Sequence, residues 1–488
     1  MTGHPRNPPL PLNYPVGRPR LRVDVLFLFI LLQIICQLAL LVPALAPLRI
    51  ILRVSEFAAS LALAALIGRQ GPFHPACVPA AFCCLVVGLN IFHPTTNTLT
   101  SGLAQATLYA ANFAPLLWVP ALRVDAPALR KVITLIWAFA VLSSVMGVLQ
   151  VYYPGKFDPN LSSAIRSYGD WYVEDLKIVL ANGERVFRPM GLTDVPGGAA
   201  NGAFVAILFS AGLLVCDRRV WVKVACVGAM PVGLFCLYLC QVRVLMMMSL
   251  ICVLVLIGIF LLRGQLARVA LLAGLMVGVV IISLTWAIAV GGEAATRRLT
   301  SLMEDNPRTV YYSNRGRFLD ETVNVLLPQY PLGAGLGRWG MMNYYFGDNS
   351  DPERAAIWAE IQWTGWLLDG GVPLILAYCA AIAAACFIAL RVALDKRLGE
   401  VGVWGAIILS FNVGTFAATF NNPIFVGSQG LEFWTLNAAL FAVATRRLAQ
   451  ARLIKSEVAV PRGIDMDETP PTVDKSKPLL SIHDGGER

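Results

Sequence analysis

Long apolar runs alternate with short polar loops along most of this chain. A transmembrane helix needs about 20 mainly apolar residues, and about 12 segments approach that length. The predicted spans are Val23–Ala44, Leu48–Ile67, Ala76–Phe92, Leu103–Leu122, Val132–Tyr153, Ala199–Cys216, Val220–Cys240, Val244–Leu262, Val269–Val290, Trp363–Leu390, Val401–Phe420 and Leu431–Val443. The pattern therefore predicts an all-α, polytopic membrane protein with about 12 transmembrane helices.

Basic residues mark every second loop, which predicts the topology. The residues concerned are Arg69, Arg123, Arg130, Lys131, Arg218, Arg219, Lys223, Arg263, Arg268, Arg391, Lys396 and Arg397. Lysine and arginine collect in cytoplasmic loops, so these loops and both termini are predicted to be cytoplasmic. We expect a tail over residues 1–22, a transmembrane domain over 23–448, and a polar, disordered tail over 449–488.

Two long loops, Pro154–Gly198 and Gly291–Ala359, then fall on the extracytoplasmic side. Long ordered loops are often functional. Within the second, residues 317–327 are expected to form a short helix that ends at Pro328. Trp358, Trp363 and Trp366 fit an aromatic belt where the chain re-enters the bilayer.

Composition agrees with a membrane protein. The 488 residues are 57% hydrophobic and 14% charged, with mean hydropathy +0.65, whereas a soluble domain has about 25% charged residues. The net charge of +9 lies largely in predicted cytoplasmic loops and tails, so it does not point to nucleic acid. All 11 cysteines lie in or at the ends of predicted spans. We therefore expect no disulfide framework, no metal site and no cofactor.

Arginine without lysine distinguishes the second long loop. Its seven arginines are Arg297, Arg298, Arg308, Arg315, Arg317, Arg338 and Arg354, and the first long loop adds Arg166, Arg185 and Arg188. The guanidinium fork suits bidentate binding of phosphate. Carboxylates in the same loops bring the net charge near zero, so most of these arginines are expected in structural ion pairs and two or three on a substrate.

Individual residues allow a functional and a structural interpretation. Arg243 lies between two predicted spans at the outer face, where it is either a phosphate clamp or an arginine paired with lipid headgroups or a carboxylate. Glu360, at the outer end of a span, is a candidate general base or an ion-pair partner of an arginine. Asp369, nine residues further on, would face the opposite side of a continuous helix.

Two further features stay open. In the second span Arg49, Arg53 and Glu56 share a helical face, which favours a buried Arg53–Glu56 pair over a substrate-lining role. The glycine-rich segment Pro331–Arg338 is neither a Rossmann fingerprint nor a P-loop, and it is equally a nest for a diphosphate or a plain turn.

Four short motifs together resemble the superfamily of O-antigen ligases and O-antigen polymerases. They are Arg188-Pro189-Met190-Gly191-Leu192; Arg243; Arg315 or Arg317 followed by Pro331-Leu332-Gly333-Ala334-Gly335-Leu336-Gly337; and Asp369-Gly370-Gly371. The resemblance implies a metal-independent membrane glycosyltransferase of the bacterial inner membrane, which moves a glycan from undecaprenyl diphosphate to a sugar hydroxyl. It also implies that arginines hold the diphosphate. Arg243 is the best match, followed by Arg188 with Arg315 or Arg317, and Arg338 of the glycine-rich segment completes the candidate set.

Glu360 stands where ligases of this family usually carry a histidine, which favours a polymerase of lipid-linked repeat units and leaves a ligase as the alternative. The expected partners are an undecaprenyl-diphosphate-linked glycan donor, a glycan acceptor and membrane lipid, with a flippase and a chain-length regulator as further candidates. A transporter or flippase is the third hypothesis. It is disfavoured because, apart from Arg53 and Glu56, the predicted spans lack charges near their middle.

Overall fold

The computed structural model describes residues 24–67, 71–159, 161, 163–166, 169–179, 183–304, 306, 309 and 311–458. The chain divides into two units, residues 1–447 and 448–488. The cavity and contacts described below belong to the first unit. In the second unit the described residues are 448–458, the last part of the helix α19. The tail predicted over 1–22 lies outside the described residues.

Helices dominate the described residues, and they follow the apolar runs of the sequence. The first half of the chain contains α1 (Asp24–Ala39), η1 (Pro43–Leu48), α2 (Arg49–Ile67), α3 (Cys77–Asn90), α4 (Leu99–Phe113), α5 (Pro115–Trp118), α6 (Ala126–Tyr152), α7 (Ser163–Arg166), α8 (Asp170–Asp175), α9 (Ala199–Cys216) and α10 (Val220–Cys240). A small hairpin of β1 (Lys177–Val179) and β2 (Arg185–Phe187) lies in the first long loop, with Ile178 opposite Val186.

The second half continues in the same way. It contains α11 (Arg243–Leu262), α12 (Leu266–Glu304), η2 (Tyr312–Gly316), α14 (Arg317–Glu321), η3 (Thr322–Leu326), α15 (Leu327–Gln329), α16 (Gly340–Phe346), α17 (Gln362–Leu394), η4 (Lys396–Leu398), α18 (Glu400–Ala418), η5 (Ile424–Val426) and α19 (Ser428–Val458). Apart from the hairpin, the regular secondary structure of the described residues is helical, as the sequence predicts.

Eight of the described helices are long and apolar enough to cross a membrane. They are Pro43–Ile67, Ala126–Tyr152, Ala199–Cys216, Val220–Cys240, Val244–Leu262, Leu266–Trp286, Gln362–Leu394 and Glu400–Ala418. The other four predicted spans also contain helices, namely α1, α3, α4 and α19. Of these, α1 and α3 are apolar but have only 16 and 14 residues, respectively.

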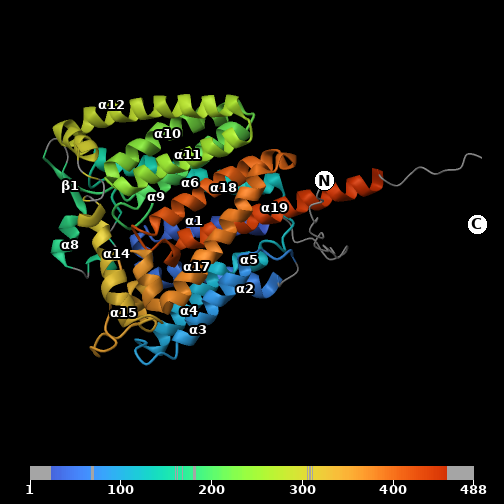
Figure 1. Ribbon diagram of the computed structural model, residues 1–488. Helices are drawn as coiled ribbons and strands as arrows, with labels where there is room; N and C mark the ends of the chain where they lie inside the picture. Colours follow the sequence, from blue (N-terminus) through green and yellow to red (C-terminus); the bar gives the residue numbers. More distant parts are fainter. Residues whose placement is uncertain are drawn as a thin grey trace, which may run out of the picture. The chain divides into compact units, whose positions relative to one another are not determined.

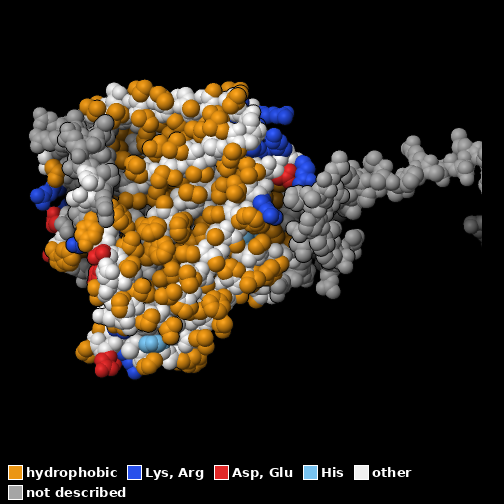
Figure 2. Space-filling model, in the orientation of Figure 1, with side chains coloured by type: hydrophobic (Ala, Val, Ile, Leu, Met, Phe, Trp, Pro, Cys, Tyr) orange, Lys and Arg blue, Asp and Glu red, His pale blue; other side chains and the backbone are white. Residues whose placement is uncertain are grey.

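Two helices lie at the centre of the bundle. α9 packs between α6 and α10, and α18 packs against α17, α11 and α9 (Figure 1). In the apolar stretches of α9 and α18, 72% and 83% of the residues are buried, whereas in the apolar stretch of α12 only 17% are buried. Figure 2 shows hydrophobic side chains spread over the helices that face the viewer, with lysine and arginine gathered at one end of them. An apolar outer surface of this kind suits contact with lipid.

Three helices extend beyond the predicted segments. The helix α12 continues to Glu304, past the predicted membrane span that ends at Val290, and its residues 291–304 are not apolar. The short helix of the second loop continues past Leu327 as α15, with Pro328 near its amino-terminal end where proline is tolerated. α19 continues to Val458, so residues 449–458, the start of the predicted tail, are helical.

The glycine-rich segment docks on a break in α17. Gly371 has φ 64° and ψ −156° inside this helix. There the Val372 N–H donates to the Pro331 carbonyl (2.9 Å), and the Ala334 N–H donates to the Leu368 carbonyl (2.7 Å). At Gly335, φ is +83° and a Cβ would lie 2.5 Å from the Thr96 nitrogen. The glycines therefore allow close backbone packing, which favours the interpretation as a structural turn.

His74 is a buried titratable group in the turn before α3. Its side chain is 0% exposed, its Nδ1 accepts from the Ala76 N–H (3.0 Å), and its ring packs edge-on against Phe441. Among the described residues its Nε2 has no partner. Burial lowers the pKa of His74 from 6.5 to about 4, because the charged imidazolium loses its hydration.

We expect His74 to make the fold acid-sensitive. Its lowered pKa means that the unfolded chain binds the proton first, so the stability contribution is complete above about pH 6.5 and falls between about pH 6.5 and 4, by about 3 kcal/mol. The measurement is the stability of the detergent-solubilised protein across this range, for the native chain and His74→Gln. Carboxylates titrate equally in both, so parallel pH curves would contradict the prediction.

Candidate functional site

A cavity of about 430 Å³ lies inside the helix bundle. Its walls come from helices distributed over the whole chain, among them α1, α4, α6, α9 and α18. Both long loops contribute as well, through residues 193–198 and 339–342, and the turn between α18 and α19 closes one side. Its volume is in the range of small-molecule sites.

One carboxylate joins the first long loop to α2 at this cavity. Asp194 accepts hydrogen bonds from Arg49 and from Arg53, the latter at 2.6 Å, and its side chain is only 3% exposed. The predicted Arg53–Glu56 pair is therefore wrong. Glu56 instead accepts from the Ser428 hydroxyl at 2.5 Å, because the turn before α19 brings that hydroxyl to it.

The Arg-Pro-x-Gly-Leu motif explains how Asp194 is held. Gln150 of α6 accepts from the N–H groups of Met190 (2.9 Å) and Gly191 (2.8 Å), and it donates to the Gly191 carbonyl (2.9 Å). The Leu192 N–H donates to the Ser143 hydroxyl at 3.1 Å. Gly191 has φ +63°, and a Cβ there would lie 2.4 Å from that hydroxyl oxygen. The motif thus docks the loop on α6 two residues before the carboxylate.

Asp369 holds two cavity-lining side chains in place. It is 0% exposed and accepts from Gln105 (2.9 Å), Tyr109 (2.8 Å) and the Trp339 indole (2.9 Å). Gln105 and Trp339 line the cavity. Asp369 is therefore a positioning residue.

Glu360 forms an ion pair with Arg315 just before α17 begins at Gln362. The exposed side-chain fractions are 18% for Glu360 and 34% for Arg315, so the pair stays accessible to solvent. The ion-pair alternative is thus found, while the role of Glu360 as a base stays a prediction. Arg317 is exposed, and its guanidinium lies 4.8 Å from the centre of the Phe318 ring.

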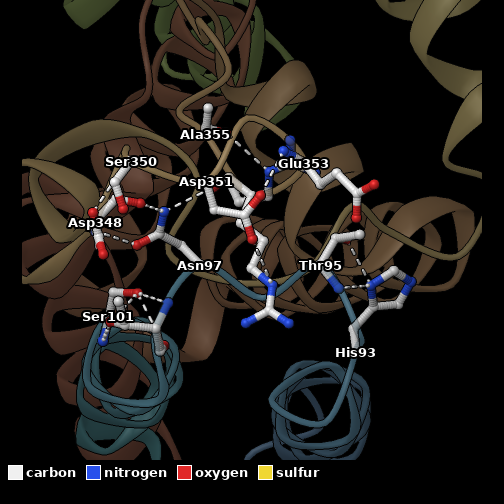
Figure 3. A network of polar contacts seen from close by, with 12 residues as sticks. His93, Thr95, Asn97, Ser101, Asp348, Ser350, Asp351, Glu353 and Ala355 are labelled. Carbon is white, nitrogen blue, oxygen red and sulfur yellow. Dashed lines mark hydrogen bonds and ion pairs between the residues drawn. The ribbon is translucent and has the colours of Figure 1, made fainter.

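Arg338 is part of the scaffold. Its side chain donates to the carbonyls of Ala355 (3.1 Å) and Ala334 (3.2 Å), and the residue is 5% exposed. Nearby, Asn97 bonds to the backbone of Asp348 and Arg354 at 2.6–2.7 Å and joins the turn before α4 to the second loop (Figure 3). These contacts favour a structural role for Arg338 over diphosphate binding.

Arg188 and Arg243 belong to neighbouring segments. The Cys240 thiol at the end of α10 donates to the Pro189 carbonyl at 3.9 Å. Gln241, with φ 55°, then turns the chain so that α11 begins at Arg243. The Arg188 N–H donates to the Leu176 carbonyl at 3.1 Å. The side chains of Arg243, Arg297, Arg298 and Arg308 lie outside the described residues.

The sequence analysis did not identify three polar residues that line the cavity, namely Asp194, Glu432 and Gln33. Asp194 follows the Arg-Pro-x-Gly-Leu motif directly, and Glu432 lies at the start of the last predicted span, where a carboxylate is costly. Both features could have been read from the sequence. Gln33 is a single amide in an apolar run, and the sequence alone does not show which residues surround it in the fold.

A scan against protein-family models finds no match for this chain, and a search of the curated proteins finds no similar sequence. The function is therefore inferred from the residues and their geometry.

Breaking the bridge at Asp194 is expected to destabilise the fold. Asp194→Asn removes the charge that two poorly exposed arginines share, at a cost of about 3 kcal/mol. Asp395→Asn is the matched control, because its partner Arg397 is 78% exposed and such a surface pair contributes less than about 1 kcal/mol. Unfolding of both variants in the same detergent gives the comparison. Equal losses in the free energy of unfolding would show that the Asp194 ion pairs contribute no more stability than the surface pair at Asp395.

Proposed function

We propose that this protein is an integral membrane glycosyltransferase that polymerises undecaprenyl-diphosphate-linked repeat units into a surface polysaccharide, at the outer face of a bacterial inner membrane. One observation carries the proposal: a cavity inside an apolar helix bundle is walled by both arginine-bearing loops. Such a site gives a polyprenyl chain an apolar surface and a sugar a polar one, while the arginines of the two loops are available to a diphosphate. The four sequence motifs support the same class.

The reaction transfers one glycosyl group. The acceptor hydroxyl oxygen attacks the anomeric carbon of the donor, the bond from that carbon to the diphosphate oxygen breaks, and its electron pair leaves with the diphosphate. The hydroxyl proton passes to Glu360. Positive charge at the departing oxygen stabilises the transition state more than the ground state.

Four arginines are proposed to supply that charge: Arg243, Arg188, Arg315 and Arg317. Arg338 leaves the candidate set because backbone carbonyls occupy its side chain. Arg315 also holds Glu360 in the resting state. When the diphosphate draws Arg315 away, the carboxylate is released to accept a proton, which couples donor binding to base activation.

A transporter is the second candidate. Glu56 is 5% exposed, and Glu432 lines the cavity. Ionisable groups inside a bundle are typical of transport pathways. Purified protein in liposomes distinguishes the two: a polymerase lengthens a lipid-linked glycan within one leaflet, whereas a transporter moves it across without lengthening it.

Arg243→Ala is expected to abolish long polymer, because the departing diphosphate loses a cation. The readout is chain length on a gel from membranes that carry equal amounts of protein. Arg397→Ala is the control, since Arg397 is exposed and pairs with its neighbour Asp395. Chains of normal length in Arg243→Ala would remove this residue from the mechanism.

Glu360→Gln is expected to lower turnover by about 10²–10⁴-fold without weakening donor binding, because the amide cannot accept the proton and leaves Arg315 free for the diphosphate. Single-turnover kinetics on purified enzyme separates the two effects. Glu353→Gln changes an exposed carboxylate of the same loop and controls for loss of charge. If turnover in Glu360→Gln matched that control, Glu360 would not be the base.

A further inference from the structure

Three residues that line the cavity each carry a buried side-chain polar atom without a hydrogen-bond partner in the described part of the chain. These atoms are Gln33 Nε2, Arg53 Nε and Glu432 Oε1. Gln33 is 9% exposed. Buried donors and acceptors without a partner are costly, so a cavity that keeps an amide donor and a carboxylate acceptor is built for a polar occupant.

The charge around the cavity argues against a diphosphate there. Among the residues that line the cavity, Arg53 is the basic one, and it bonds to Asp194, which also binds Arg49 from α2. Asp194 and Glu432 both line the cavity, so one guanidinium faces two carboxyl groups. An anionic ligand would have to compete with Asp194 for Arg53 and would lie beside the Glu432 carboxyl group.

The remaining polar lining consists of amide side chains and of the hydroxyl groups of Ser143, Thr193, Thr415 and Ser428. Gln33, Gln37, Gln105, Asn201 and Gln429 all line the cavity. A side-chain amide both donates and accepts hydrogen bonds, as a sugar hydroxyl does. Ile30, Leu108 and Trp339 provide the apolar wall, and such a wall with a few convergent polar groups is typical of small-molecule sites.

We propose that this cavity is a binding site for an uncharged sugar ring, with one hydroxyl donating to Glu432 and another accepting from Gln33. The site is separate from the loop arginines that hold the diphosphate. The inference rests on the proposed function in one respect, namely that the sugar belongs to a lipid-linked glycan. Asp369 serves this site indirectly, because it positions Gln105 and Trp339.

The test measures binding apart from transfer. The full-length protein in lipid nanodiscs is titrated with the methyl glycosides of glucose, galactose, mannose and N-acetylglucosamine, and binding is followed by saturation-transfer NMR against empty nanodiscs. At least one glycoside is expected to bind. Gln33→Leu and Glu432→Leu should each weaken its binding about tenfold, the loss expected for one buried hydrogen bond.

The control variants carry the same Gln→Leu and Glu→Leu substitutions at residues that do not line the cavity. Gln329→Leu changes an exposed glutamine, and Glu400→Leu changes a carboxylate that pairs with Arg130; neither should alter binding. Gln33→Asn is the second cavity variant should Gln33→Leu fail to fold, because it keeps the amide and withdraws it from the ligand. Inorganic pyrophosphate should not displace the glycoside.

Three results would overturn the proposal: no glycoside binding above the empty nanodisc, equal affinity in native and cavity-variant protein, or displacement by pyrophosphate. A polymerising enzyme that shows any of these loses the sugar site and keeps its proposed function. Glycoside binding that depends on Gln33 and Glu432, in a protein that never lengthens a lipid-linked glycan, keeps the sugar site and removes the proposed polymerase.

Discussion

The buried carboxylate of Asp369 is the interaction on which the rest of this site depends. A charge with no exposed surface must be matched by donors, and here Gln105, Tyr109 and Trp339 supply them. Two donors come from α4 and one from the segment that follows the glycine-rich turn. The carboxylate thus joins α4, α17 and the second long loop at one point, beside the break at Gly371. Because Gln105 and Trp339 also line the cavity, the same contact fixes its wall.

The length of the apolar runs predicted most of the helices, but it did not predict helical segments that are polar. Residues 291–304 continue α12 although they are polar, since helix formation there does not require burial in lipid. Trp366 shows a second kind of failure. Its place in the sequence suggested an interfacial belt, but it is 0% exposed and packs against Tyr378 and Phe425. Hydropathy identifies a membrane span but does not show which side of the helix packs against other helices and which side faces lipid.

The sequence predicted which types of residue belong to the candidate site, but it did not predict which of them form ion pairs with each other. Arginine in the long loops drew attention to the two loops that contribute to the cavity wall, and Glu360 was recognised with an arginine as its alternative partner. The pairs themselves join distant positions, Arg315 with Glu360 and Arg53 with Asp194. Spacing on one helix favoured Arg53 with Glu56. That pair does not form because the loop docked by Gln150 presents Asp194 to both arginines.

The proposed reaction needs two electrostatic environments close together, and the distribution of charge offers them. A departing diphosphate requires cations, whereas a neutral sugar requires hydrogen-bonding groups without a surplus of positive charge. At the cavity, Asp194 binds both arginines of α2, and of these two only Arg53 lines the cavity, together with the carboxyl groups of Asp194 and Glu432. In the second loop Arg317 remains exposed, and Arg315 has one exchangeable partner. In the proposed reaction, the loop arginines would bind the diphosphate and the cavity would bind the sugar, so that one substrate would be held in one orientation.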